Sequence, residues 1–323
     1  MPSLLLRIAA ALCLAAALPA QAAAITLGLA RSPLALPVHI AQVEGYFAAE
    51  GLQVRVLECP SGLRCLRAML DGQADLATVA DTALTFTAFE RSDFAVLATV
   101  SRTRSDSKIV GRRSRGIVLP RDLVGRKVGV LAGTSAHYFL DAYLLVHGVD
   151  PAGVQTVPLQ PEQTQNAITS GQVDAISVFE PYAYRAAAAL GSDATVLRDD
   201  GGIYMATFNL VARRALVGVR DADLAAALRA VARAQALIRD DPAKAQALLR
   251  RWLDTDADFI AAVWPGLRFE LSLDQGLLKT MESEARWALR EGHVKATAMP
   301  NLLPLLHGAP LRAVDPDAVG IAR

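Results

Sequence analysis

A short run of small residues, Gly133-Thr134-Ser135-Ala136-His137, is the part of the chain with the clearest capacity to bind a ligand. It follows the apolar run 128–132, which is typical of a strand, and it precedes a helical pattern. A helix that begins here presents unpaired backbone N–H groups, and roughly half a positive charge, to whatever lies before it. The sequence has no Glu or Gln at the positions where a capping box would place one, so no carboxylate competes for these groups. The run therefore predicts a site for a small anion, formed by Thr134, Ser135, Ala136 and His137.

Strand and helix patterns alternate along the rest of the chain, which is typical of parallel sheets covered by helices. Ligands of such folds bind beyond the carboxyl ends of the strands, where a strand turns into a helix. Besides the run just described, the turns of this kind are 31–37, 80–83 and 179–181. These turns and a returning strand near residue 209 supply the other candidate ligand residues, which are Ser32, Thr82, Glu180 and Asn209.

Two of these turns contain carboxylates that need a partner. We expect Asp81 to cap the helix that follows it, while Thr82 offers its hydroxyl and N–H to the ligand. A carboxylate beside an anion site costs energy unless it meets a cation. We therefore expect Glu180 to face an ammonium group of the ligand, or an arginine such as Arg102 or Arg104.

The strands and helices form two similar groups, which predict two lobes that face a cleft. We expect residues 23–102 together with 208–323 to form one lobe, and residues 103–207 to form the other. The arginine-rich stretch 102–115 is interpreted as a solvated hairpin near the boundary. A single helix is predicted over 38–50.

The N-terminus has the pattern of an export signal. Arg7 precedes a short apolar run, and Ala20-Gln21-Ala22 fits the small-residue cleavage rule, so residues 1–22 are predicted to be a signal peptide. Export would place the mature chain in an oxidising compartment. There the two remaining cysteines, Cys59 and Cys65, favour a disulfide, and two separate buried thiols are the alternative.

Composition narrows the function by exclusion. The chain has 323 residues, of which 53% are hydrophobic, and a formal net charge of +1. This balance creates no overall field that favours nucleic acid or an anionic membrane. The five histidines lack metal-ligand spacing, and no motif indicates a cofactor, so we expect neither a metal nor a cofactor.

Four segments, in this order, resemble motifs of the nitrate/sulfonate/taurine periplasmic binding proteins and their thiamine-precursor relatives. The segments are EGYFAAEGL at 44–52, LDGQAD at 70–75, GTSAH at 133–137, and GQVDA at 171–175 followed by FEPY at 179–182. The resemblance covers roughly residues 25–295, and the GTSAH segment is similar to the turn of the sulfonate branch.

This resemblance implies a type II periplasmic binding protein. Two α/β lobes, each with a mostly parallel sheet, would close by a hinge over a small anionic solute. The protein would be a periplasmic monomer that performs no chemistry and delivers its solute to an inner-membrane ABC permease with its ATPase. Sulfonates and taurine are the favoured ligands, and nitrate, bicarbonate, an aromatic carboxylate and a pyrimidine are the alternatives. The alternative functions are a thiamine-precursor binding or synthesis protein of the same fold, and a periplasmic sensor partner.

Overall fold

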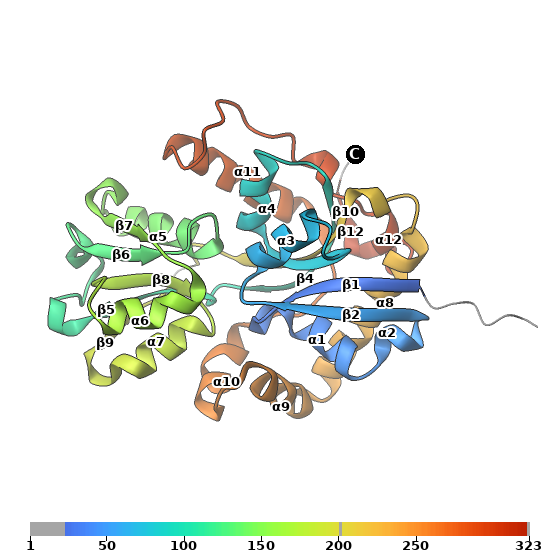
Figure 1. The fold of residues 1–323 in the computed structure, drawn as a ribbon, viewed down its shortest axis with the longest axis horizontal. Helices are drawn as coiled ribbons and strands as arrows, with labels where there is room; N and C mark the ends of the chain where they lie inside the picture. The colour runs from blue at the N-terminus through green and yellow to red at the C-terminus, as the bar shows by residue number, and fades with distance from the viewer. Residues whose placement is uncertain (1–22, 200–201, 322–323) are drawn as a thin grey trace, which may run out of the picture.

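The chain folds into two α/β lobes, which lie side by side in Figure 1. The computed structural model describes residues 23–199 and 202–321, so the predicted signal peptide lies outside the described residues. Each lobe is built on a five-stranded sheet with helices packed against it. This is the two-lobed architecture expected from the alternating strand and helix patterns.

The first sheet has the strand order β2-β1-β3-β10-β4. Its strands are β1 (Ala23–Ala30), β2 (Leu52–Cys59), β3 (Leu76–Ala80), β4 (Phe94–Thr103) and β10 (Ala206–Arg213). Strands β1, β2 and β3 are parallel, whereas β10 runs antiparallel to both β3 and β4. Strands β3, β4 and β10 are buried along almost their whole length, as expected where helices cover both faces of a sheet.

The second sheet repeats this arrangement with the order β7-β6-β8-β5-β9. Its strands are β5 (Ser107–Arg112), β6 (Lys127–Val130), β7 (Gln155–Pro158), β8 (Ala175–Phe179) and β9 (Ala194–Leu197). Here β5 is the antiparallel strand, between β8 and β9. In each sheet the antiparallel strand is therefore the one that arrives from the other lobe.

The prediction of a solvated hairpin over 102–115 is wrong. The middle of this stretch forms β5, whose Ile109 and Val110 are fully buried. The basic residues lie around this short apolar core, and Arg112 donates to Asp193 at 2.9 Å beside the sheet. A few apolar residues between charges form an interior strand here because neighbouring strands pair with both of its edges.

Helices cover both sheets and form most of the C-terminal part. The first lobe contains α1 (Leu36–Val43), α2 (Tyr46–Ala49), α3 (Gly62–Leu70), α4 (Asp81–Ala88), α8 (Asp221–Asp240), α9 (Pro242–Leu253), α10 (Ala257–Val263), α11 (Gln275–Arg290) and α12 (Ala309–Arg312), with a short ribbon of β11 (Leu273–Asp274) and β12 (Val319–Gly320). The second contains α5 (Ser135–Val146), α6 (Thr164–Thr169) and α7 (Tyr182–Leu190). The single helix predicted over 38–50 is two helices, because Gly45 adopts a left-handed φ of 72° that ends α1. Across the described ranges, no helix combines the length and the apolar character needed to cross a membrane.

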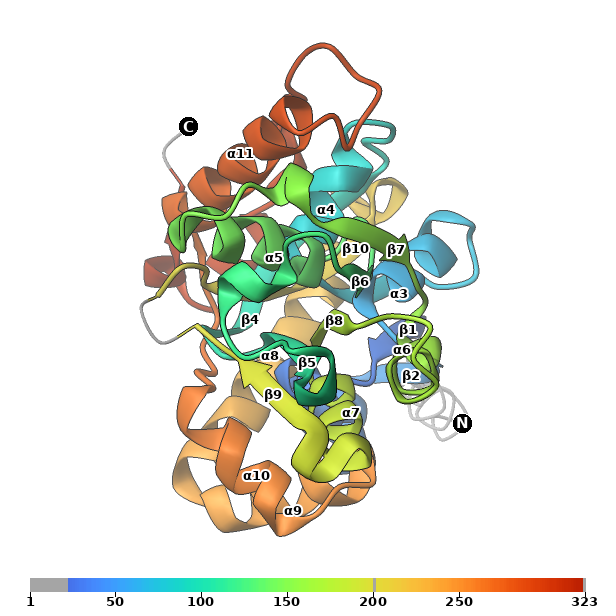
Figure 2. The same cartoon turned by 90° about the vertical axis from the view of Figure 1, so that its left-hand side faces the viewer.

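The chain crosses between the lobes twice, from β4 to β5 and from β9 to β10. Parts of the first lobe also flank the second: Figure 2 shows α4 and α11 above it and α9 and α10 below it. Hydrogen bonds join the lobes, since the Tyr182 hydroxyl donates to the carbonyl of Pro60, just before α3, at 3.0 Å, and Arg185 donates to the carbonyl of Leu253, at the end of α9, at 2.6 Å. The structure therefore represents a closed arrangement of the lobes.

Candidate ligand-binding cleft

A small cavity lies between the lobes, at the carboxyl ends of their strands. It has a volume of about 30 Å³, which is room for only one or two water-sized molecules, so a larger solute enters only when the lobes separate. The first lobe contributes Arg31, Ser32, Pro60, Ser61, Gly62, Leu63, Ala80, Ala83 and Phe208; the second contributes Thr134, Ser135 and Phe179; Asp106 comes from the first crossing.

The start of α5 forms one wall of this cavity. Gly133 has a left-handed φ of 71°, and Thr134 at the N-cap is extended, with φ −123° and ψ 171°. The Thr134 hydroxyl donates to the Leu131 carbonyl at 2.7 Å and so does not cap the helix. In the ranges that the structure describes, the backbone N–H groups of Ser135 and Ala136 meet no acceptor. The helix start therefore keeps two donors available at the cavity wall.

The start of α3 forms the opposite wall, which sequence reasoning did not include. Ser61 caps this helix by accepting from the Arg64 N–H at 3.4 Å, while the N–H groups of Gly62 and Leu63 lack acceptors within the described residues. A Cβ on Gly62 would lie 2.8 Å from the Cα of Val79, so glycine lets this helix start approach β3. Two helix starts, one from each lobe, thus face a shared cavity with the positive ends of their dipoles.

A disulfide holds this second helix start in place. Cys59 ends β2 and Cys65 lies in the first turn of α3, and their sulfur atoms are bonded. The Cα atoms are 5.6 Å apart, within the usual range for a disulfide. The bridge closes the loop that carries Pro60, Ser61 and Gly62, and therefore fixes the first-lobe wall of the cavity.

The turn after β1 also reaches the cavity. Ser32 lies in its wall and accepts from the Leu34 N–H at 3.2 Å, so its hydroxyl oxygen is partly engaged by the chain itself. The Arg31 guanidinium donates to Glu58 at 3.1 Å and to the Trp252 carbonyl at 2.7 Å. Its positive charge is therefore balanced beside the cavity rather than left free for an anion.

Thr82 is buried outside the cavity wall, and its hydroxyl is already used. It lies 2.5 Å from the Glu284 carboxyl and 3.1 Å from the Tyr204 hydroxyl. The prediction that Asp81 caps α4 is also wrong, because Ala80 occupies the N-cap. The Asp81 carboxylate instead accepts from the Tyr204 hydroxyl and from Thr207.

This buried group holds two carboxyls, and their protons can be counted. The contacts Tyr204–Asp81, Tyr204–Thr82 and Thr82–Glu284 require three protons, whereas the two hydroxyls supply two. One of the two carboxyls must supply the third, and Glu284 is the one whose pKa is raised further. Burial and the neighbouring Asp81 raise the pKa of Glu284 well above its usual range, which agrees with this count. Burial likewise raises the pKa of Asp81 to about 6.

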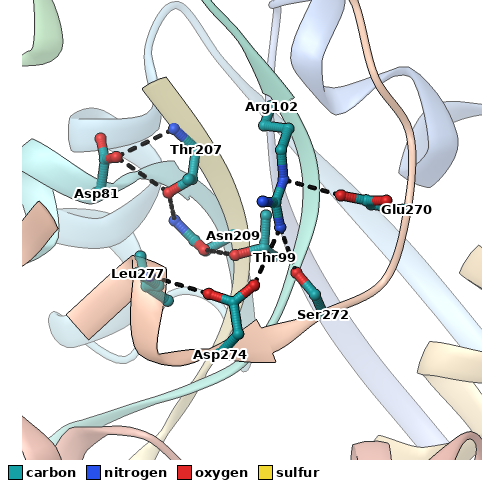
Figure 3. Close-up of polar contacts among 9 residues, drawn as sticks. All are labelled: Asp81, Thr99, Arg102, Thr207, Asn209, Glu270, Ser272, Asp274 and Leu277. Carbon is teal, nitrogen blue, oxygen red and sulfur yellow. Dashed lines mark hydrogen bonds and ion pairs between the residues drawn. The ribbon is translucent and has the colours of Figure 1, made fainter. Parts of the chain in front are cut away.

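Asn209 lies inside the first sheet rather than at the cavity (Figure 3). Its amide oxygen accepts from the Thr99 hydroxyl at 2.8 Å, and its amide nitrogen donates to the Val79 carbonyl at 3.3 Å and to the Thr207 hydroxyl at 3.2 Å. These bonds link three neighbouring strands of the sheet. The structure therefore gives Asn209 a structural role.

Glu180 is buried beside the cleft, and its partner differs from the predicted ones. Its carboxylate forms an ion pair with Lys108 of β5 and accepts from the Tyr184 N–H at 3.0 Å. The two predicted arginines are engaged elsewhere: Arg102 pairs with Glu270 at 3.0 Å (Figure 3), and Arg104 donates to the Gly202 carbonyl. Lys108 was not predicted as the partner because it lies in the stretch 102–115, which was interpreted as a solvated hairpin.

Asp106 is the carboxyl that lines the cavity itself. It lies next to Glu180 at the first crossing and is 9% exposed. Burial raises the pKa of Asp106 to about 7, with Glu180 adding to the rise and Lys108 opposing it. The cavity wall therefore holds two helix starts with N–H donors that meet no acceptor among the described residues, and one carboxyl whose pKa is raised to about 7.

The last two predicted ligand residues point away from the cavity. The Ala136 side chain packs in the core of the second lobe, and its carbonyl accepts from the Ser177 hydroxyl at 2.7 Å. The His137 ring is buried where α5 meets α4 and α11 of the first lobe, with its centroid 4.2 Å from that of His293. Burial, with His293 nearby, lowers the pKa of His137 to about 4. Of the eight predicted ligand side chains, Ser32, Thr134 and Ser135 meet at the cavity, with Ala136 contributing its N–H at the helix start.

Comparison with known proteins places this geometry in a family. The family model described as NMT1/THI5 like matches residues 32–245, more than half of the chain. The taurine-binding periplasmic protein of Escherichia coli (strain K12) is 29% identical over 180 residues, which are 55% of this chain and 54% of that protein. The chain thus spans about half the length of this relative.

Solved structures share the fold. The alkanesulfonate-binding protein from Xanthomonas axonopodis pv. citri, bound to MOPS, superposes with a TM-score of 0.77 and 18% identity, covering 90% of this chain and 99% of that one. A desulfurization enzyme gives a TM-score of 0.66 and 17% identity, covering 91% and 99%. The two-lobed fold predicted from the sequence is confirmed, and it occurs in binding proteins and in an enzyme. By its family match, the chain belongs to the NMT1/THI5-like family.

Proposed function

We propose that this chain is the extracytoplasmic solute-binding component of an ABC importer and that it captures one small oxyanion. Sulfonates and taurine are the favoured solutes. The observation that carries the proposal is the pair of opposed helix starts in the cleft. The family membership and the taurine-binding relative support it. The molecule acts by closing two lobes over the solute and performs no chemistry on it.

The anion would be held by backbone N–H groups. The donors of Ser135 and Ala136 lie on one side and those of Gly62 and Leu63 on the other, so a tetrahedral oxyanion can accept from both lobes at once. A hydrogen bond to a charged group contributes about 1.5–3 kcal/mol, and each helix start adds up to ~2 kcal/mol when partly buried. Binding would therefore favour the closed state, in which both sets of donors converge.

Asp106 gives the cleft a second property. A simple anion is opposed by this carboxyl once it ionises, whereas a solute that also carries an ammonium group gains a partner. This favours an aminosulfonate such as taurine over a plain inorganic oxyanion at neutral pH. Nitrate, bicarbonate, an aromatic carboxylate and a pyrimidine remain competing solutes for the test below.

The partners follow from the proposed role. An inner-membrane permease with its ATPase would receive the solute from the closed form, and the protein would work as a periplasmic monomer after removal of residues 1–22. Thiamine-precursor binding or synthesis on the same fold is the competing function. The cleft favours an oxyanion over a thiamine precursor as the solute, because the cavity walls offer backbone N–H donors at both helix starts.

The proposal is tested by a thermal-shift and calorimetry panel of taurine, alkyl and aryl sulfonates, nitrate, bicarbonate and pyrimidines. A solute that binds only the folded state raises the melting temperature by mass action. Ser135→Pro removes one N–H donor at a position where proline suits a helix start, since Thr134 before it is extended. Ser135→Ala keeps the N–H and is the matched control. We expect at least a tenfold weaker affinity for the proline variant alone, because one donor to a charged group contributes about 1.5–3 kcal/mol. Absence of a shift with every oxyanion would refute the proposal.

A further inference from the structure

A second group of polar side chains lies outside the cleft, where α5 of the second lobe meets the chain that follows α11 of the first. His137 and Asp141 are one turn apart on α5, and His293 approaches them from the segment after α11. One potential ligand atom from each of the three residues lies within 4.8 Å of the others. His293 Nε2 is 3.0 Å from Asp141 Oδ2.

We propose that His137, Asp141 and His293 bind a divalent transition-metal ion, with Zn²⁺ as the best match, and that the ion fastens the two lobes together. Two imidazoles and one carboxylate are a donor set that zinc accepts, with a fourth position left for water or another ligand. Neither an i, i+3 nor an i, i+4 pair of histidines occurs, so histidine spacing alone did not predict this group. The informative spacing is His137 to Asp141, which places both side chains on one face of α5.

The distances are close to those of a zinc site. Zinc–nitrogen and zinc–oxygen bonds of about 2.0–2.1 Å place the atoms of a tetrahedral set roughly 3.3 Å apart. The His293–Asp141 contact already fits this spacing. The widest pair, at up to 4.8 Å, would close by about 1.5 Å, which side-chain rotation can supply.

The surroundings provide support for the ligands and an entry path for the ion. The Trp287 indole N–H donates to Asp141 Oδ2 at 3.1 Å, and such outer hydrogen bonds orient ligating carboxylates. The Trp287 ring lies edge-on to His137, 5.2 Å between centroids. Both histidines line a large open cavity of about 960 Å³, from which an ion and its remaining ligand can enter.

The position of the group gives the ion a structural consequence. His137 and Asp141 belong to the second lobe, whereas α11 is joined to α4 of the first lobe through Glu284 and Thr85. An ion shared by both sides would therefore stabilise the closed arrangement of the lobes. In the structure, His293 and the Trp287 indole both contact Asp141 Oδ2, and the Gly133 N–H donates to His137 Nδ1 at 3.4 Å, which leaves Nε2 of His137 for an ion.

The test is a Zn²⁺ titration of the chelator-treated, tag-free chain by calorimetry, without any solute, followed by Co²⁺ substitution to read the coordination from visible absorption. We expect one ion per chain and at least a tenfold loss of affinity in Asp141→Asn and in His293→Asn. Asp141→Asn still accepts from Trp287, so its fold is expected to survive, as checked by circular dichroism. His147→Ala, on the last turn region of the same helix, is the matched control and should bind as the wild type does.

Two results would overturn the proposal. One is the absence of Zn²⁺ binding by the folded chain, and the other is equal affinity in the wild type and both cluster variants. Because no solute is present, either result leaves the oxyanion proposal for the cleft untouched. A rise in melting temperature with Zn²⁺, lost in His293→Asn, would support fastening of the lobes.

Discussion

Replacement of Asp106 by asparagine is expected to stabilise the protein at alkaline pH. The side chain is buried at the first crossing, and its pKa is raised from 3.8 to about 7. A carboxyl whose pKa is raised in the folded state is tolerated there in its protonated form, whereas its ionised form destabilises the folded state relative to the unfolded state. The cost of burying it therefore grows as the pH rises from about 4 and is complete above about 7.

The size of the effect follows from the same values. A rise from 3.8 to about 7 corresponds to roughly 4 kcal/mol of unfolding free energy at neutral and higher pH. Asparagine has nearly the same shape and carries no charge, so Asp106→Asn is expected to recover a few kcal/mol at about pH 8 and almost nothing at about pH 4. Such a gain at a cleft residue is typical of a group kept for function rather than stability.

The measurement is urea unfolding of the wild type and the variant across this pH range, with Glu162→Gln at an exposed position as the control. The wild type should lose stability relative to Asp106→Asn between about pH 4 and 7, and the control should follow the wild type. A variant that is less stable than the wild type at about pH 8, or a difference that does not change with pH, would show that the ionised Asp106 carboxylate does not destabilise the fold.

The remaining predictions concern the buried network and the disulfide. In Glu284→Gln, an amide N–H can take the place of the third proton, so the free energy of unfolding should change by less than about 1 kcal/mol. Glu284→Ala leaves a cavity and unpaired hydroxyls and should cost roughly 2–5 kcal/mol. Equal losses of stability in the two variants, measured by thermal or urea unfolding, would contradict a neutral Glu284 carboxyl. Replacement of Cys59 and Cys65 by alanine removes a short loop closure and should lower the free energy of unfolding by roughly 2 kcal/mol. The affinity for the solute should also fall, because the cavity wall at Ser61 and Gly62 becomes less rigid. Unchanged affinity in calorimetry would show that the disulfide does not support the binding site.

Most of the fold follows from local patterns in the sequence. The alternation of apolar strands and amphipathic helices predicts two similar lobes, and each lobe is built on its own five-stranded sheet. The prediction was wrong where tertiary pairing outweighed composition, as in β5, whose apolar centre is masked by flanking arginines. It was also wrong at Gly45, because the sequence around a glycine in a helical pattern does not indicate whether that glycine adopts a left-handed conformation.

The cleft was harder to predict than the fold. The start of α5 follows from a strand, a small-residue turn and a helix pattern, and Thr134 and Ser135 do line the cavity. The side-chain partners of Thr82, Glu180 and Asn209 depend on residues far away in the chain, such as Glu284 and Lys108, and no local pattern specifies these pairs. Ser61-Gly62 carried the same strand-to-helix signal as the other turns and could have been included.

The most direct test of the central claim is a crystal structure of the mature chain with the tightest-binding oxyanion of the panel. We expect the anion between the lobes, with its oxygens within hydrogen-bond distance of the N–H groups of Ser135 and Ala136 on one side and Gly62 and Leu63 on the other. An anion bound elsewhere, or one held by side chains of a single lobe without these donors, would contradict it.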